Sequence, residues 1–217
     1  MSLRINEIFY SLQGEGLYAG VPTVFIRLQG CNVGCTWCDT KKSWDPKKGD
    51  ATWSIDHIVT AAEFRRNKKG ERHACITGGE PLQSDIYILE DLCARLQRLN
   101  YTVSLETSGV AGDSADLFTV LEGFDHITLS PKSHVPFDAY RSTFLKAHVI
   151  KTVVCTHMDI TRALDLREKA APEVLHYLQP VYSETEVNPT AQKLCVDACL
   201  DHGFRLSTQL HKILRIP

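Results

Sequence analysis

The sequence predicts an α/β fold built on an incomplete (β/α) barrel of about six parallel strands. Three observations predict it: apolar strand-like segments recur along the chain, helical segments lie between them, and a polar or glycine-rich end follows each strand. Strands that alternate with helices form βαβ units and a parallel sheet. Six strands are too few to close an eight-stranded barrel. We therefore expect a partial barrel.

The expected elements follow in order along the chain. The strands are 23–29, 74–77, 102–105, 126–129, 148–154 and 174–178, and the helices lie near 55–68, 84–99, 114–122, 159–170 and 190–202. Ligand sites in such sheets gather at the carboxyl ends of the strands. A single polar strand end is more often a turn, but several together predict one shared site.

Three cysteines follow the first expected strand at CxxxCxxC spacing, and they are Cys31, Cys35 and Cys38. Iron–sulfur clusters are held by cysteine thiolates at short spacings of this kind. Three thiolates leave one iron of a four-iron cube open to a small molecule. A structural zinc site is the alternative, but it needs four nitrogen or sulfur ligands, and the nearest histidine downstream is His57. The pattern favours an open-cornered cluster that takes part in chemistry.

Length and composition fit one domain of 217 residues, of which 43% are hydrophobic, with a formal net charge of −2. No basic block or long apolar run points to a nucleic acid or a membrane as partner. The first residues lack the apolar stretch of a signal peptide. The eight cysteines are therefore expected to be reduced thiols of a cytoplasmic protein.

Five cysteines lie outside the motif. Cys75 and Cys155 belong to apolar strand-like segments and are expected to be small core residues. Cys195 and Cys199 lie four residues apart, on one face of an expected helix. Helix packing is favoured for this pair, and a second metal site is the alternative.

Two strand ends carry groups suited to ligand binding. Gly78 and Gly79 would let the backbone approach a ligand closely, and the Glu80 carboxylate could hold an ammonium group; an ordinary turn is the alternative. Asp39 and Thr40 follow the last motif cysteine and could hold Mg²⁺. The residue types alone favour a helix cap there.

Three further features precede or follow the motif cysteines. The loop 13–16 (QGEG) suits contact with a flat polar ligand, with an ordinary turn as the alternative. Arg27 interrupts an apolar strand, where a charge is costly unless it is paired. It either binds a ligand carboxylate or pairs with an internal Asp or Glu. His211 stands alone near the C-terminus, where a lone histidine is usually structural.

These motifs resemble the radical S-adenosylmethionine (SAM) superfamily and, within it, the 7-carboxy-7-deazaguanine synthase family. The resemblance runs from end to end of the chain. It is most specific in the LQGEG loop, the CDT sequence and the LHK tail, and it covers 7–16, 25–32, 35–40, 77–81, 106–109, 130–132, 178–180 and 205–212. The family fold is a reduced (β/α) barrel of radical SAM type that acts as a homodimer. The resemblance therefore implies a single radical SAM domain over 1–217.

The resemblance also assigns roles to residues. Cys31, Cys35 and Cys38 would bind one [4Fe-4S] cluster per chain, and Thr40 would ligate Mg²⁺ instead of capping a helix. The residues expected to contact SAM are Trp37, Cys38, Asp39, Gly79, Glu80, Ser130, Pro131, Lys132, Gln179, Pro180, Val181 and Tyr182. Those expected to contact the substrate are Leu12, Gln13, Gly14, Glu15, Arg27, Thr77, Glu106, His211 and Pro217.

The reaction implied by the resemblance converts 6-carboxy-5,6,7,8-tetrahydropterin into 7-carboxy-7-deazaguanine, in queuosine biosynthesis, with release of ammonia. A 5′-deoxyadenosyl radical from SAM would take hydrogen from C6, the ring would contract, and hydrogen would return to the cofactor. An electron donor such as flavodoxin or ferredoxin would reduce the cluster. A radical activase that makes a glycyl radical on a partner protein shares the cysteine motif and is the alternative, as is a non-catalytic iron–sulfur or zinc protein.

The C-terminal tail bears on the same site. Chain ends are usually frayed unless something holds them, but 213–217 contains three aliphatic residues. We expect these to dock against the barrel and to fix the Pro217 carboxylate near the guanidine-like edge of the pterin.

Overall fold

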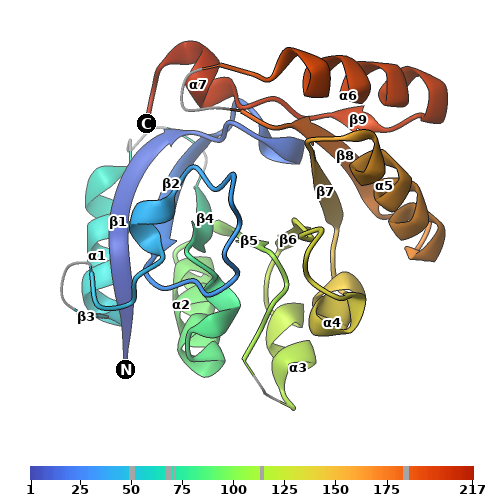
Figure 1. Ribbon diagram of the computed structural model, residues 1–217. Helices are drawn as coiled ribbons and strands as arrows, with labels where there is room; N and C mark the ends of the chain where they lie inside the picture. The colour runs from blue at the N-terminus through green and yellow to red at the C-terminus, as the bar shows by residue number, and fades with distance from the viewer. Residues whose placement is uncertain (49–51, 67–69, 71, 113–114, 183–185) are drawn as a thin grey trace.

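One curved sheet of nine strands organises the residues that this computed structural model describes, namely 1–48, 52–66, 70, 72–112, 115–182 and 186–217 (Figure 1). The strands are β1 (Ser2–Leu12), β2 (Pro22–Leu28), β3 (Thr52–Ser54), β4 (His73–Gly78), β5 (Thr102–Thr107), β6 (His126–Leu129), β7 (Val149–Val154), β8 (Leu175–Pro180) and β9 (Arg205–Leu206). Their order in the sheet is β3-β1-β2-β4-β5-β6-β7-β8-β9.

The six strands expected from the sequence are β2 and β4 to β8, and each pairs in parallel with its neighbour. The short β9 continues the parallel set beside β8. β1 and β3 pair antiparallel and extend the opposite edge. The expected partial barrel is confirmed, with three more strands than the sequence indicated.

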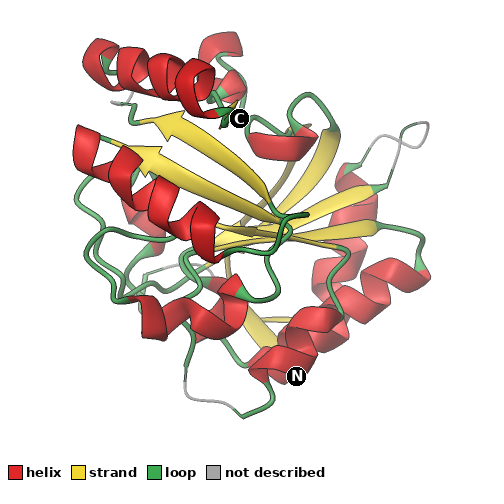
Figure 2. Cartoon of the chain, turned by 90° about the vertical axis from the view of Figure 1, so that its right-hand side faces the viewer, coloured by secondary structure: helices red, strands yellow, loops and turns green. Residues whose placement is uncertain are grey.

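Helices cover the outer face of the sheet (Figures 1 and 2). They are α1 (Ile55–Arg65), α2 (Ile86–Arg98), α3 (Leu117–Glu122), α4 (Arg141–Phe144), α5 (His157–Lys169), α6 (Pro189–His202) and α7 (Leu210–Leu214), with 3-10 turns η1 (Gly16–Tyr18), η2 (Lys41–Ser43), η3 (Pro81–Gln83) and η4 (Phe137–Tyr140). The five expected helices correspond to α1, α2, α3, α5 and α6. Positions 67–68 and 114 of those expectations lie outside the described residues. The short α4 and α7 were not expected.

The apolar periodicity of the helices determines which face they bury. In α2, Leu89, Leu92 and Leu96 recur at three- and four-residue intervals and are fully buried. The Asp85 side chain accepts hydrogen bonds from two amides of the first turn and so caps α2. These side chains join a core that packs beneath β1, β2, β4 and β5.

A second core cluster contains the paired cysteines of α6. Cys195 is fully buried beside Val154 and Ile160, and Cys199 packs against the same cluster. The helix-packing interpretation of this pair is confirmed. Cys75 is fully buried as expected, whereas Cys155 is half-buried just past the end of β7.

Aromatic and histidine rings fill the barrel at the amino ends of the strands. Tyr18 of η1 lies 4.5 Å from the His73 ring and 5.0 Å from the His126 ring, centroid to centroid. Burial lowers the pKa of both histidines to about 4, so both are neutral at neutral pH. This packing leaves the carboxyl ends of the strands as the place for a ligand.

No helix in the described part of the chain is both long enough and apolar enough to cross a bilayer.

Candidate active site

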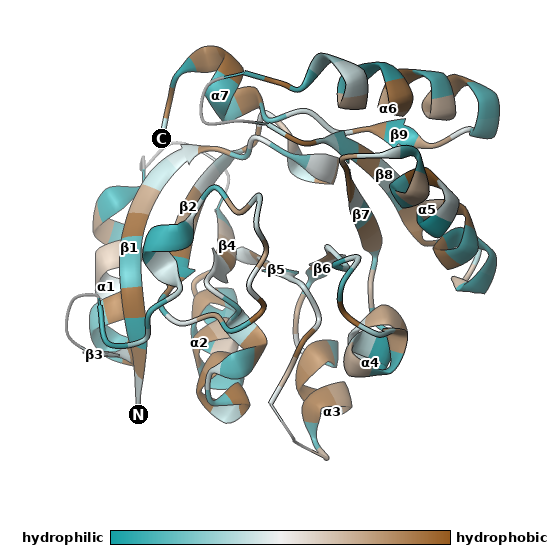
Figure 3. Ribbon diagram, in the orientation of Figure 1, coloured by the Kyte–Doolittle hydropathy of each residue, from teal (hydrophilic) through white to brown (hydrophobic). Residues whose placement is uncertain are grey.

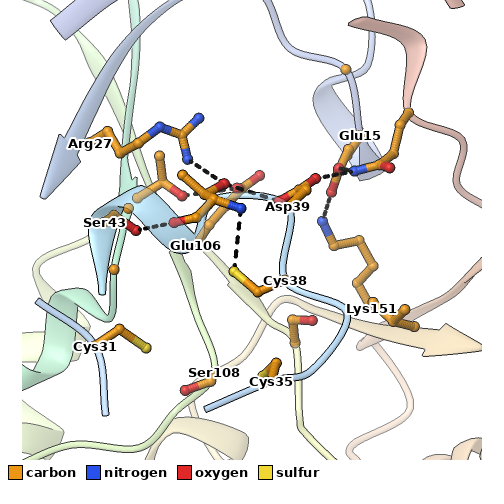
Figure 4. A pocket seen from close by; sticks show the side chains of 18 of the residues that line it. Glu15, Arg27, Cys31, Cys35, Cys38, Asp39, Ser43, Glu106, Ser108 and Lys151 are labelled. Carbon is orange, nitrogen blue, oxygen red and sulfur yellow. Dashed lines mark hydrogen bonds and ion pairs between the residues drawn. The ribbon is translucent and has the colours of Figure 1, made fainter. Parts of the chain in front are cut away.

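A cavity of about 680 Å³ opens among the carboxyl ends of the strands, the loop after β2 and the C-terminal tail. Its size is within the range of pockets that hold cofactors and small substrates. All the site residues expected from the sequence line it except Gln13 and Pro131. The two halves of the cavity differ in character, with the motif cysteines in one and a buried ion pair in the other (Figure 4).

The cysteine loop is fastened to β4 by backbone contacts at the glycine pair. Gly79 N–H donates to the Leu28 carbonyl at 3.0 Å, and Glu80 N–H donates to the Gly30 carbonyl at 2.8 Å. A Cβ at Gly79 would lie 2.0 Å from Gly30 O, and Gly78 has a φ of +125°. The glycines are therefore required by close backbone packing at a turn. Both glycines also line the cavity, so the contact with a ligand expected there stays a prediction.

The sulfur of Cys38 accepts hydrogen bonds from two N–H groups that follow it closely in the sequence. The donors are the Trp44 indole at 3.3 Å and the Thr40 amide at 3.4 Å. N–H donors favour a thiolate over a thiol, and hydrogen bonds to sulfur are a feature of iron–sulfur sites. Burial raises the pKa of the Cys31 and Cys35 thiols. The loop fits a cluster whose iron displaces these protons.

A single zinc ion fits less well. Within the described residues, no three His, Cys, Asp or Glu side chains converge as they would on one ion. The motif cysteines surround a shared space instead, as ligands of separate irons do. His57 stacks on Trp53, 4.2 Å between ring centroids, and does not line the cavity.

A half-buried lysine lies beside the cysteines. Lys132 Nζ donates to Ser130 Oγ at 2.9 Å and lies 5.0 Å from the centroid of the Trp37 ring. Burial lowers the pKa of Lys132, while the nearby Cys35 thiol acts in the opposite direction. A cation in this place would offset the negative charge of thiolates at Cys35 and Cys38.

Glu80 is almost fully buried, and its carboxylate is saturated by the protein. It accepts hydrogen bonds from the Leu82 amide at 3.1 Å, the Ser108 amide at 2.7 Å, and the hydroxyls of Thr107 and Ser108. Four donors occupy the acceptor sites of a carboxylate. An ammonium group at Glu80 would have to share the carboxylate with these donors, and the expected contact stays a prediction. Glu80 ties the end of β4 to the end of β5.

The other half of the cavity contains a buried ion pair that the sequence analysis missed. Lys151 of β7 donates to the Glu15 carboxylate, which also accepts from Gln209 Nε2 at 2.7 Å. Burial raises the pKa of Glu15, but the Lys151 ammonium outweighs this effect, and the pKa lies below its ordinary value. Burial lowers the pKa of Lys151, and Glu15 and Glu106 reverse this, so the net shift is upward. Both groups are charged at neutral pH.

Gln13 supports this half of the cavity from behind. Its side chain is buried, and Nε2 donates to Glu106 Oε1 at 3.0 Å. Thr77 Oγ1 donates to the other oxygen of Glu106 at 3.3 Å. Gln13 and Thr77 therefore orient the Glu106 carboxylate toward the cavity. Pro131 is likewise buried behind the wall.

Arg27, Thr40 and Asp39 form a polar group between the two halves. Arg27 Nε donates to Glu7 Oε1 at 2.9 Å, and its NH1 lies 3.5 Å from Thr40 Oγ1. Thr40 Oγ1 donates to Asp39 Oδ1 at 3.0 Å. Thr40 precedes η2, but its hydroxyl makes no capping bond, so the capping interpretation is wrong. Arg27 pairs with the internal Glu7 and also faces the cavity. The internal pairing and a contact with a ligand are therefore compatible.

Asp39 is ionised throughout the physiological range. Burial raises the pKa of Asp39, but Lys212 and the side chain of Gln209 lower it by more, so the net pKa is about 2. Lys212 Nζ lies 3.3 Å from Asp39 Oδ2. The carboxylate and the adjacent Thr40 hydroxyl are oxygen donors of the kind that Mg²⁺ prefers.

The C-terminal tail closes over the N-terminal loop. Leu210 N–H donates to the Gly14 carbonyl at 2.9 Å, and Ser11 Oγ donates to the Pro217 carbonyl oxygen at 2.7 Å. Pro217 lines the cavity. Two of the three aliphatic residues do not dock as expected, because Ile213 and Leu214 are 58% and 49% exposed, whereas Ile216 is half-buried. Hydrogen bonds hold the tail in place of apolar packing.

Further residues line the cavity without having been expected there. They are Glu7, Phe9, Phe25, Val33, Lys42, Ser43, Trp44, Thr107, Ser108, Thr128, Lys151, Val153, Gln209 and Lys212. Lys151 could have been predicted as a site residue, because it places a charge within an apolar strand, as Arg27 does. Gln209 and Lys212 flank His211 in the tail, so their proximity to it in sequence could also have been used.

Comparisons with known proteins agree with this geometry. The radical SAM superfamily matches residues 25–194. The chain is 34% identical over 236 residues to the 7-carboxy-7-deazaguanine synthase of Escherichia coli (strain K12) and 34% identical over 233 residues to that of Buchnera aphidicola subsp. Schizaphis graminum, with all of both chains covered in each case. The crystal structure of QueE from Escherichia coli matches with a TM-score of 0.77 and 31% identity, over 97% of this chain and 95% of that one. The chain therefore belongs to the radical SAM superfamily and, within it, to the 7-carboxy-7-deazaguanine synthase family.

Proposed function

We propose that the cavity binds SAM beside the cysteine loop and 6-carboxy-5,6,7,8-tetrahydropterin beside Glu15, Lys151 and Glu106. The protein is a radical SAM enzyme of 7-deazapurine biosynthesis, and the reaction yields 7-carboxy-7-deazaguanine and ammonia. The observation that carries the proposal is that the LQGEG loop, the cysteine loop and the C-terminal tail line one cavity. These are the three segments in which the sequence is most specific to the family.

Membership of the superfamily brings a [4Fe-4S] cluster and SAM as cofactors, and the family uses Mg²⁺. Cys31, Cys35 and Cys38 would hold the cluster, and Lys132 would lie beside it. SAM would contact Trp37, Asp39, Gly79, Ser130, Lys132 and the segment 179–182, all of which line the cavity. Pro131, behind the wall, would shape this contact. When bound and reduced, the cluster and SAM supply a 5′-deoxyadenosyl radical.

The polar groups of the second half suit a pterin. Its guanidine-like edge presents N–H donors, for which the carboxylates of Glu106 and Pro217 are natural acceptors. Lys151 keeps Glu15 ionised and so preserves a further acceptor. Gly14 and Leu12 provide a flat wall, and His211 lies against Gly14.

The substrate carboxylate would lie near Thr40 and Arg27. Thr40 would ligate Mg²⁺ through its hydroxyl, and the Asp39 carboxylate accepts the hydrogen bond that this hydroxyl donates. The guanidinium of Arg27 would face the substrate carboxylate while Glu7 holds it in place. This chain's residues would thus hold the substrate at both ends.

As a radical SAM enzyme, the protein needs a substrate and a reductant. We further propose that residues 1–217 act as one domain, that the reductant is a flavodoxin or ferredoxin, and that two chains form a homodimer. β9 is the last strand of the sheet, and exposed Leu206, Ile213 and Leu214 lie on β9 and α7 (Figure 3), which supports an interface there. Eight cysteines without a disulfide support a cytoplasmic location.

Anaerobic turnover tests the proposed function. The reconstituted protein, reduced with dithionite and given SAM, Mg²⁺ and the carboxypterin, should form the deazapurine, detected by its ultraviolet absorbance, together with ammonia. Catalytic return of hydrogen predicts little net 5′-deoxyadenosine. If SAM is cleaved without pterin conversion, the substrate assignment is wrong. A glycyl radical on a partner protein would then support the activase alternative.

A further inference from the structure

A basic surface segment lies directly beside the cysteine loop. Residues 41–48 (KKSWDPKK) contain four lysines and one aspartate, in a chain whose net charge is −2. Lys41, Lys42, Lys47 and Lys48 are all exposed. Lys42 pairs with Glu7 at 3.1 Å. We call residues 41–48 the lysine segment.

Arg4 adds to this charge from β1. Its NH1 donates to the Pro46 carbonyl at 2.6 Å, which places the exposed guanidinium beside the lysine segment. Among the described residues, the neighbouring carboxylates include Glu7, Asp39 and Asp45. Glu7 is shared between Lys42 and Arg27, and Asp39 pairs with Lys212. The surface here is therefore cationic, although the chain as a whole is weakly acidic.

The lysine segment is also the protein surface bonded to a cluster ligand. The Trp44 indole N–H donates to Cys38 Sγ, and Lys41 lies 5.9 Å from the centroid of the Trp44 ring. Backbone bonds join the same segment to the start of the cysteine loop: Gly30 N–H donates to the Ser43 carbonyl at 2.7 Å, and Cys31 N–H donates to the Trp44 carbonyl at 3.0 Å. A side chain on this surface thus touches the sulfur that would ligate iron.

We propose that the lysine segment is the docking surface for a small acidic redox protein that delivers single electrons to the cluster through the Trp44–Cys38 contact. This inference rests on the proposed function, which requires a reduced cluster. One electron leaves the reduced flavin or iron–sulfur centre of the donor, which is oxidised by one electron, and the cluster is reduced by the same one. Opposite charges on the two surfaces speed and orient the encounter.

An acidic protein fits this surface better than a nucleic acid does. The four lysines lie in one short segment, Lys41 lies over the Trp44 indole, and that indole bonds to Cys38 of the adjoining cysteine loop. Binding of a nucleic acid does not require a contact with a cluster ligand. Electron transfer does require such proximity, because its rate falls steeply with the distance between donor and cluster.

A charge-reversal variant tests the docking surface without touching the cavity. Lys41→Glu, Lys47→Glu and Lys48→Glu are combined, because none of the three lines the cavity, and Lys42 is left in place. The matched control combines Arg98→Glu, Lys169→Glu and Lys193→Glu, exposed positions on α2, α5 and α6, and has the same net charge.

Binding of an acidic flavodoxin in its oxidised form is measured by calorimetry at several salt concentrations. Reduction of the cluster by the same flavodoxin, in its reduced form, is followed by stopped-flow absorbance. The charge-reversal variant should lose about tenfold or more in affinity and in reduction rate at low salt, and its affinity should depend less on salt. The control variant should stay close to the wild type.

Dithionite-driven turnover separates this inference from the proposed function. All three proteins should turn over equally with dithionite, since this small reductant needs no docking surface. If the charge-reversal variant binds and is reduced by flavodoxin as the wild type is, or if the control loses as much, the proposal is overturned. Tighter binding of a polyuridine RNA than of flavodoxin at this segment would also overturn it. Failure of the wild type to convert the pterin with dithionite would refute the proposed function alone.

Discussion

His211 lies against Gly14 so closely that a Cβ at position 14 would be 2.1 Å from His211 Nδ1. The contact joins the loop after β1 to α7 over the mouth of the cavity, and the Leu210 amide strengthens it by donating to the Gly14 carbonyl. The chain thus uses its two ends, 197 residues apart by number (211 minus 14), to build one wall of the site.

Gly14→Ala should displace His211 and, with it, the C-terminal tail. We expect the substrate KM to rise by about tenfold or more, on the scale of one lost charge-assisted hydrogen bond, while iron content is unchanged. Steady-state kinetics and iron analysis check this. Gly112→Ala is the matched control, because a Cβ there meets nothing within 4 Å. An unchanged KM in the Gly14 variant would show that the wall tolerates the shift.

Lys151→Met should leave Glu15 as a buried charge without its partner. Breaking a buried pair in this way costs roughly 3–5 kcal/mol of stability. Burial then raises the pKa of Glu15 above its ordinary value, so folding favours the protonated form. The melting temperature of the variant should therefore rise as the pH falls toward the raised pKa of Glu15, and its KM should rise as Glu15 takes up a proton.

In the wild type, the contribution of Glu15 to stability should change with pH in the opposite direction. The folded pKa of Glu15 lies below its unfolded value, so its stabilisation is complete at neutral pH and is lost only as the pH falls through the folded pKa. The double variant Glu15→Gln with Lys151→Met removes both charges and should be more stable than the single Lys151 variant. Equal stability of the two variants would mean that the ion pair is not coupled.

Cys31→Ala, Cys35→Ala and Cys38→Ala should each abolish the charge-transfer absorbance of the reconstituted protein, because each thiolate would hold one iron. Cys195→Ala and Cys199→Ala are the controls, since both side chains belong to the packing of α6. Their iron content should stay near that of the wild type. Loss of iron in either control would reveal a second metal site.

Thr40→Ala should lose the stimulation of turnover by Mg²⁺ and keep the cluster. A helix cap would be worth about 1 kcal/mol, but the Thr40 hydroxyl makes no capping bond. We therefore expect an almost unchanged melting temperature. Kinetics with and without Mg²⁺, together with thermal unfolding, distinguish the two roles. A lowered melting temperature with intact Mg²⁺ dependence would restore the capping role.

Deleting Pro217, or adding a C-terminal tag, should raise the substrate KM far more than it changes iron content. Loss of one charge-assisted hydrogen bond, at roughly 1.5–3 kcal/mol, corresponds to about ten- to a hundredfold in affinity. A tag on the N-terminal Met1, which lies outside the cavity, is the control. Equal KM values for the two tagged proteins would show that the terminal carboxylate does not reach the substrate.

The parallel strands could be predicted because each is a short apolar run with a polar end. β1 could not be, since its register with β2 shifts between Ile5 and Glu7. The shift places buried Ile5 and Ile8 three residues apart, and this spacing breaks the two-residue alternation that marks a strand. The edge strands β3 and β9 have only three and two residues, too few to carry any period.

The candidate site was predictable where a residue type is unusual for its setting. Cysteine spacing and Arg27 gave such signals, and Lys151 gave the same signal without being used. The lysines of 41–48 were missed because Trp44, Asp45 and Pro46 interrupt them, so they do not form a continuous basic block. The net charge of the whole chain also hides them, because acidic residues elsewhere offset their charge. Their meaning depends on the contact between Trp44 and Cys38, which only the folded chain brings together.

The fastening of the cysteine loop by Gly79 and Gly30 has a consequence for cluster assembly. Backbone hydrogen bonds from Gly79 and Glu80 to Leu28 and Gly30 hold the start of the loop without any help from a metal. In zinc fingers, metal binding and folding are the same event, and much of the binding free energy orders the chain. We therefore expect this loop to lose less conformational entropy than a zinc finger does when iron arrives. Apoprotein that has folded first should then remain competent to receive its cluster.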